Sequence, residues 1–269
     1  MTHRLSALAL ISFLGLLATG CGGGGGDDGD DGFPRDDGFP IPNAAVGGWW
    51  LGTTVIADQG TYELIGIVAE NGRAYFLQED GIMYWGTVRS SGNQVTGTFS
   101  GAGIMGTEFW DGALSGTGSL SGTVQARALL SGTSVFTTTL NNSSNSAFSL
   151  GYQQIYDDDS SLELIAGNYV DVLGLYAGVL NIASNGDVFL QDPISGCVVN
   201  GRIAIINSAY NAYDVRLTYS SCTGTEAVMN GATFTGLGSY DDGYGQLIAL
   251  VQGTVSGSPY PNAFVFERL

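Results

Sequence analysis

From Gly47 onward, apolar and polar residues alternate with a period close to two. Short runs rich in Val, Ile, Thr, Tyr and Phe are separated by Gly, Asn, Asp and Ser at roughly ten-residue intervals, a pattern typical of β-strands joined by tight turns. Asn71-Gly72 and Asn185-Gly186 each lie between two such runs, and this dipeptide favours a two-residue hairpin turn. The C-terminal part of the chain predicts eight strands, near residues 168–172, 176–183, 187–191, 197–206, 213–220, 232–239, 245–252 and 261–268.

The short links indicate that consecutive strands pair in an up-and-down order. Closure of eight antiparallel strands into a barrel leaves no exposed sheet edge, so an eight-stranded barrel is expected, with a β-sandwich as the alternative. Residues 159–165 combine a helix-capping start with helix-forming residues and predict one helical turn. The fold class is therefore all-β.

The pattern occurs twice, which indicates a duplication. Gly47-Gly48-Trp49 aligns with Gly167-Asn168-Tyr169, and the two Asn-Gly turns align with each other. Two homologous antiparallel units are expected, at residues 43–157 and 158–269, each the size of an ordinary domain.

Two cysteines of the second unit, Cys197 and Cys222, align with Ile82 and Ala102 of the first. Both partners are thus missing together from the first unit, as expected for a bonded pair, and a disulfide is predicted. Alternating apolar residues in the 197–222 hairpin predict Ile203 opposite Leu217 and Ile205 opposite Val215. This pairing needs a bulge near Ser220-Ser221.

The N-terminus has the features of a secretory signal peptide. His3 and Arg4 precede an apolar stretch at residues 5–17, which is too short to span a bilayer. The string Leu17-Ala18-Thr19-Gly20-Cys21 resembles the lipobox of bacterial lipoproteins, with Ala18 where Leu is more common. The resemblance implies cleavage after residue 20 and acylation, including palmitate, of Cys21. Several acyl chains would anchor the protein stably.

Residues 21–42 predict a flexible tether. Polyglycine is followed by Asp27–Asp37, which holds six of the 25 acidic residues of the chain, and such a segment cannot form a core. A calcium site is the alternative, but the twelve-residue loop with a closing Glu is absent. The whole pattern also resembles uncharacterised outer-membrane lipoproteins of Gram-negative bacteria. Gly22, which stands where an Asp would favour the inner membrane, implies the outer membrane.

The Gly-x-aromatic start of each unit resembles the Gly-x-Trp start of lipocalin-type and avidin-type barrels. In those families the ring closes the floor of the barrel. The resemblance implies this role for Trp49 and Tyr169.

Charge and composition exclude several classes of function. From residue 21 the chain has seven arginines, no lysine, no histidine and 25 acids, so 7 − 25 gives a net charge of −18. Such a surface repels phosphates, and nucleic acid binding is not expected. The absence of histidine and lysine removes Ser-His-Asp and Cys-His sites, Schiff-base chemistry and histidine metal sites. No cofactor or metal is predicted.

A glycosidase-like carboxylate pair is the remaining enzymatic option. Glu79-Asp80, Glu108 with Asp111, and Asp241-Asp242 are available, but they lie at expected turns, and no spacing selects a pair. The sequence therefore predicts a protein that is not an enzyme.

Aromatic residues near polar groups are the remaining candidates for binding. Tyr84-Trp85 and Phe109-Trp110 are expected mainly in the barrel interiors. Tyr210 and Tyr213, near the tip of the 197–222 hairpin, are predicted to be an exposed contact site. The expected function is an outer-membrane lipoprotein that acts as a binding or structural module, with an envelope protein, a secreted protein or a glycan as partner. The alternatives are an inhibitor or immunity protein for a secreted enzyme, and a lectin-like protein.

Overall fold

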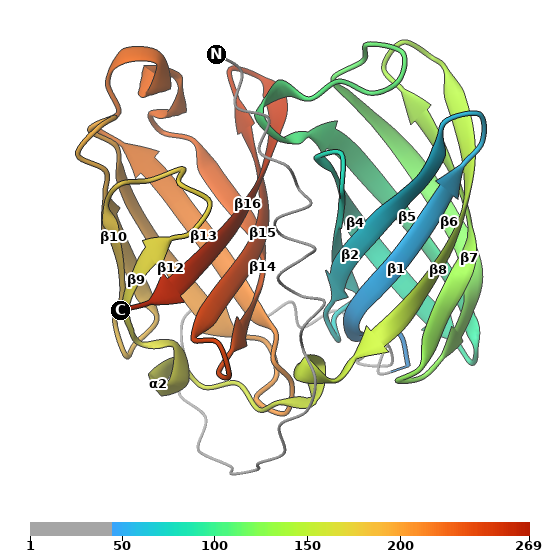
Figure 1. Ribbon diagram of the computed structural model, residues 1–269, viewed down its shortest axis with the longest axis horizontal. Coiled ribbons are helices and arrows are strands. Elements are labelled where there is room, and N and C mark those ends of the chain that lie inside the picture. The colour runs from blue at the N-terminus through green and yellow to red at the C-terminus, as the bar shows by residue number, and fades with distance from the viewer. Residues whose placement is uncertain (1–44) are drawn as a thin grey trace.

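A computed structural model describes residues 45–269, which form two closed, eight-stranded antiparallel β-barrels (Figure 1). The proposed signal peptide, Cys21 and the 21–42 tether lie outside the described residues. The strands of the first barrel are β1 (Gly48–Ile56), β2 (Gly60–Val68), β3 (Arg73–Gln78), β4 (Ile82–Ser91), β5 (Gln94–Gly103), β6 (Ser115–Gln125), β7 (Leu129–Thr138) and β8 (Ser143–Gln153). The strands of the second are β9 (Gly167–Asp171), β10 (Val179–Ile182), β11 (Asp187–Gln191), β12 (Val198–Ile205), β13 (Tyr213–Ser220), β14 (Thr233–Asp241), β15 (Gln246–Val255) and β16 (Ser258–Arg268).

Each strand pairs with the next one along the chain, and the first strand of each barrel pairs with its last. The prediction of two all-β units that each form an up-and-down barrel is therefore confirmed, and the sandwich alternative is excluded. All eight strands expected in the second unit are present, and β11 and β13 have the predicted bounds.

Short helical segments occupy the links between strands. They are η1 (Ile104–Gly106), η2 (Gln154–Asp157), α2 (Leu162–Ile165) and η3 (Gly224–Met229). The predicted turn of helix between the barrels is α2, where the Ser161 side chain accepts a hydrogen bond from the Leu164 N–H at 3.0 Å. This contact is an ordinary N-cap.

The two Asn-Gly hairpins have the same detailed geometry. Ala69 N–H donates to Arg73 O and Ala183 N–H to Asp187 O, both at 2.9 Å, so three residues lie inside each last bonded pair rather than the predicted two. Gly72 and Gly186 have φ of 83° and 86°, and each donates its N–H to the carbonyl three residues earlier. Gly72 also accepts from Val88 N–H, and Gly186 from Ile203 N–H, both at 2.8 Å. A type I turn followed by a left-handed glycine explains both loops. The shared hydrogen bonds support the duplication at the level of structure.

The aromatic residue that closes the floor of the first barrel is Trp50, not Trp49 as the alignment predicted. Trp50 is wholly buried in the barrel, and its indole N–H donates to Val46 O at 3.1 Å. Tyr169 does the same in the second barrel, donating to Ile165 O at 2.7 Å. Trp49 points outward, because side chains alternate along a strand. The equivalence of the two units is therefore shifted by one residue here.

Inward-facing glycines give the first barrel room for large rings. A Cβ added to Gly118 would lie 2.5 Å from Val135 O and 2.6 Å from the ring of Phe99. Phe99 and Phe136 lie on either side of Gly118 in the strand register and stack with their centroids 5.9 Å apart. Any larger residue at Gly118 would displace this stack or the neighbouring strand.

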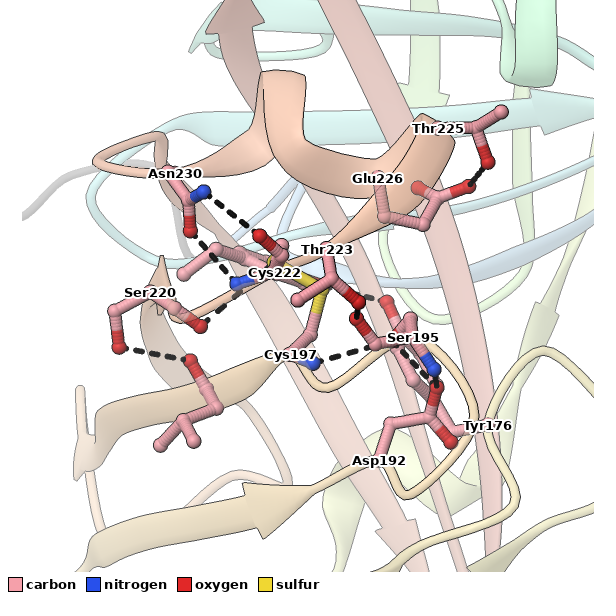
Figure 2. The surroundings of a disulfide bond; sticks show 12 residues. Tyr176, Asp192, Ser195, Cys197, Ser220, Cys222, Thr223, Thr225, Glu226 and Asn230 are labelled. Atoms are coloured by element: carbon pink, nitrogen blue, oxygen red, sulfur yellow. Dashed lines mark hydrogen bonds between the residues drawn. A yellow bond between two sulfur atoms is a disulfide. The ribbon is translucent and has the colours of Figure 1, made fainter.

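Cys197 and Cys222 form the predicted disulfide (Figure 2). The expected alternation of faces in this hairpin is correct, but the predicted partners are wrong by two residues. Ile203 lies opposite Val215 and Ile205 opposite Tyr213. The irregularity is at Ser221. The ladder ends at the pair Val198 and Ser220, and the disulfide joins Cys197 to Cys222, so Ser221 is an additional residue on this strand, with a φ of 58°.

The two barrels pack against each other through outward-facing apolar side chains of β2–β4 and β14–β16. Figure 1 shows these two sets of strands on the facing sides of the barrels. Arg73 at the start of β3 donates to Asp214 at 2.7 Å and to Gly236 O at 3.1 Å. The Tyr75 hydroxyl donates to Thr235 O at 3.2 Å. The buried cluster includes Ile65, Ile67, Leu77 and Met83 from the first barrel, and Leu237, Ile248, Leu250 and Val265 from the second.

The segment between the barrels adds a polar contact to this interface. The hydroxyl of Tyr156, in η2, donates to the buried carboxylate of Glu70. Burial raises the pKa of Glu70 above its ordinary value, although the hydrogen bond from Tyr156 acts in the opposite direction. The ring of Tyr156 stacks on Tyr210 of the second barrel, with centroids 5.3 Å apart.

Candidate functional site

The interior of the first barrel contains a cavity of about 80 Å³. Inward-facing residues from all eight strands contribute to its wall, because the side chains of an up-and-down barrel alternate between the core and the outside. Representative lining residues are Ile56, Leu64, Phe76, Val88, Leu120 and Phe148. A cavity of this kind is large enough for more than one water molecule and is predominantly apolar.

One end of this barrel is closed. Trp50 and Val46 are both fully buried there, and Tyr152 packs edge-on against Trp50 with ring centroids 5.4 Å apart. Toward the other end, Phe99 and Phe148 keep partial exposure although they face inward. The cavity is therefore accessible from the end opposite Trp50, where the loop between β1 and β2 lies. This loop is at the upper end of the barrel in Figure 1.

Aromatic rings form one wall near the open end. Tyr84 packs edge-on against both Phe99 and Phe136, at 5.6 and 5.5 Å between centroids. The loop that contains η1 adds Phe109, which stacks on Phe136 at 4.8 Å, and Trp110, which lines the cavity while 42% exposed. These rings offer flat apolar faces that a ligand could contact.

A few hydroxyl and amide groups lie among the apolar residues of the cavity. The side chains of Ser134 and Ser146 share a hydrogen bond at 2.7 Å, and the Tyr84 hydroxyl donates to Gln78 at 3.3 Å. Burial, with Asp80 nearby, raises the pKa of Tyr84, so its hydroxyl stays protonated. None of the residues that line the cavity carries a charge.

The second barrel has a better filled interior. Its cavity is about 30 Å³ and lies among buried residues such as Leu190, Val215 and Phe264. The hydroxyl groups of Tyr176 and Tyr219 form a hydrogen bond of 2.7 Å in this interior. The same topology thus leaves accessible space in one barrel and little in the other, and the difference lies in the inward side chains.

Of the aromatic residues that the sequence offered as binding candidates, Tyr84, Trp85 and Trp110 line this cavity. The sequence did not single out the small residues that leave the space open, although a signal was present. On β5–β8 many of the inward positions beside the large rings hold glycine or serine. Examples are Gly97, Gly101, Gly116, Gly118, Gly122, Gly132, Ser134, Ser144 and Ser146. Small inward residues leave volume unfilled in the barrel. They can be recognised only when it is known which alternate residues of each strand face inward.

The predicted contact site at Tyr210 and Tyr213 does not form as an exposed surface. Tyr213 is 0% exposed and faces the interior of the second barrel, so the expectation of its exposure is wrong. Tyr210 is half-buried against Tyr156. Its loop is fixed by Asn211, whose amide donates to Ile155 O at 3.1 Å. The aromatic tip therefore packs against another part of the same chain.

The carboxylates considered for catalysis take part in local turns. Asp80 accepts from Ile82 N–H and from the Gln78 amide, at 3.1 and 2.9 Å. Burial acts to raise the pKa of Asp111, but hydrogen bonds, chiefly from Thr138 and Asn142, lower it below its ordinary value. Among residues 45–269 there is no group of three or more Asp, Glu, Cys or His that could hold a metal ion.

No protein-family model matches this chain, and a search of curated proteins finds no match. Within the part of the chain that the structure describes, no helix has the length and apolar character needed to cross a membrane.

Proposed function

We propose that this chain is a non-enzymatic binding module of the bacterial cell envelope. Its first barrel holds a small, largely apolar ligand, and its second barrel is a structural unit packed against the first. The cavity of the first barrel is the observation that supports this proposal. Binding sites for small molecules are typically concave and apolar with a few polar groups, and this cavity has that composition. Hydrolysis of ester, peptide, phosphate or glycoside substrates is not expected.

Filling the cavity should abolish ligand binding. Ser146→Leu adds an apolar side chain at an inward position of β8, beside the accessible part of the cavity. A small alcohol such as 1-hexanol should bind this variant about tenfold or more weakly than the unchanged protein, a loss of about 1.4 kcal/mol. Chemical-shift titration of the isotope-labelled protein measures both the affinity and the location of the probe.

Ser149→Leu is the matched control, because Ser149 lies on the same strand with its side chain exposed outside the barrel. It should bind 1-hexanol like the unchanged protein. Equal binding by Ser146→Leu, or shift changes confined to the outer surface, would contradict a ligand site inside the barrel.

The location of the protein is a second part of the proposal. We infer a lipid anchor at Cys21 and attachment to the outer membrane, supported by the Leu17–Cys21 string, by Gly22 and by the tether that follows. In Cys21→Ser, labelling with radioactive palmitate should be lost, and the protein should leave the membrane fraction or retain its signal peptide. A Gly24→Ser change in the tether should leave labelling intact. Labelling that persists without Cys21 would overturn the anchor.

A further inference from the structure

The loops at the open end of the first barrel carry negative charge only. In an up-and-down barrel, the loops that follow β1, β3, β5 and β7 all lie at the same end, and this is the open end of the cavity. These loops span residues 57–59, 79–81, 104–114 and 139–142, and they contain no lysine, arginine or histidine. Their five acidic residues are Asp58, Glu79, Asp80, Glu108 and Asp111.

The arginines of this barrel lie toward the closed end. Arg73 begins β3 and is paired with Asp214 of the second barrel. Arg127 lies in the loop between β6 and β7 and is paired with Asp157 at 2.9 Å. Arg89 lies near the C-terminal end of β4, close to the loop that follows Ser91. All three arginines of the first barrel therefore lie toward its closed end, and the loops at the mouth carry only carboxylates.

This distribution of charge affects which ligands can enter the cavity. A cleft with charges of one sign at its mouth concentrates ligands of the opposite sign, and the low-dielectric wall of the barrel strengthens the field. An anionic ligand would meet five carboxylates at the mouth and no positive side chain among the lining residues. Two of these carboxylates are close to the lining: Asp80 accepts from Gln78, and Asp111 directly follows Trp110.

The aromatic wall also suits a positive charge. Tyr84 and Trp110 line the cavity near the mouth, and Trp110 remains partly exposed there. The face of an indole or phenol ring attracts a cation within about 6 Å of its centre. An ammonium group at the mouth could contact such a ring and the carboxylates together.

We propose that the ligand of the first barrel is a hydrophobic cation, with its apolar part in the cavity and an ammonium-type group at the acidic mouth. This inference rests on the proposed function, since it assumes that the cavity binds a ligand. It adds the charge of that ligand and the part of the site that selects it.

Three probes with the same chain length test the proposal: hexylammonium, 1-hexanol and hexanoate. Each is titrated into the purified protein at neutral pH, and the shift changes of the lining residues give the affinity. At low ionic strength we expect hexylammonium to bind about tenfold more tightly than hexanoate, with 1-hexanol between them. High salt should reduce this ratio, because it screens charges at the protein surface.

A triple variant tests the role of the mouth. Asp58→Asn, Glu79→Gln and Glu108→Gln remove three of the five charges, and Asp80 and Asp111 are kept because they hold turns through hydrogen bonds. The preference for hexylammonium over hexanoate should fall to about threefold or less, while 1-hexanol binds as before and shows that the cavity is intact. The control variant makes the same change in net charge on the second barrel, at the exposed residues Glu163, Glu226 and Glu267, each changed to Gln. It should keep the preference.

The outcomes separate the two proposals. If 1-hexanol binds in the cavity but hexanoate binds as tightly as hexylammonium, or the triple variant keeps the full preference, the inference about charge is overturned and the apolar site stands. If none of the three probes shifts the lining residues, the proposed ligand site falls, and this inference falls with it.

Discussion

Ile67→Asp is expected to lower the free energy of unfolding by about 4 kcal/mol or more. Ile67 lies on β2 with its side chain outside the first barrel, and it is 0% exposed because the second barrel covers it. A carboxylate at this position would lose its hydration among the apolar side chains of the surrounding cluster. Urea denaturation followed by tryptophan fluorescence measures the change, and Trp49 in the same cluster reports on the contact.

Two further variants separate the effect of the interface from that of the strand. Ile67→Val keeps the position apolar and should cost about 1 kcal/mol. Val55→Asp places the same charge on an outward position of β1 that is 50% exposed, and it should change stability by less than about 1 kcal/mol. If Ile67→Asp lowered the free energy of unfolding no more than Val55→Asp, the described contact between the two barrels at Ile67 would be wrong.

Replacing Cys197 and Cys222 together by alanine is expected to lower the free energy of unfolding by about 3 kcal/mol. The bond joins residues 25 positions apart and restricts the unfolded chain, while in the folded state it ties the link before β12 to the link after β13. Urea denaturation with and without reductant measures the loss. Reductant should destabilise the unchanged protein by a similar amount and leave the double variant unaffected.

The hydrogen bonds around the disulfide provide the control. The Thr223 hydroxyl donates to Ser195 O at 2.8 Å, and Asn230 both donates to and accepts from the backbone of Cys222 (Figure 2). Thr223→Val removes one of these contacts and should cost only about 1 kcal/mol. A double-alanine variant no less stable than Thr223→Val would show that the neighbouring hydrogen bonds, and not the disulfide, hold this end of the barrel.

The sequence by itself determined the class of fold and the number of units. Period-two alternation, turn residues at regular intervals and the internal repeat are local properties, and each depends on backbone geometry that neighbouring residues specify. The strand at 213–220, the helical turn before the second barrel and the disulfide were all predictable on this basis. The cysteine pair was predictable because it is missing as a pair from the other copy.

Residues close together in the sequence did not determine the strand registers or the lengths of the hairpin loops. One additional residue at Ser221 moves the partner of Ile203 by one position, from the Arg216 that regular pairing from the disulfide would give to Val215, which is two residues from the predicted Leu217. The same kind of one-residue ambiguity affected the two adjacent tryptophans, of which Trp50 faces inward and Trp49 outward. Two neighbouring residues of one type fit the sequence pattern equally well, and only closure of the barrel decides between them.

The candidate site was decided by the tertiary structure. Tyr213 and Tyr210 were attractive from their position in a hairpin, but the interior of one barrel and the packing of the linker cover them. The cavity instead depends on small residues from different strands that share the inward face of the first barrel. The restriction of the arginines to the closed end, which leaves only carboxylates in the loops at the mouth, likewise has no counterpart in the order of residues, because alternate loops of an up-and-down barrel lie at opposite ends. The sequence determines the volume and charge of each side chain. The cavity that the side chains enclose and the electrostatic field that they produce arise only when the strands close into a barrel.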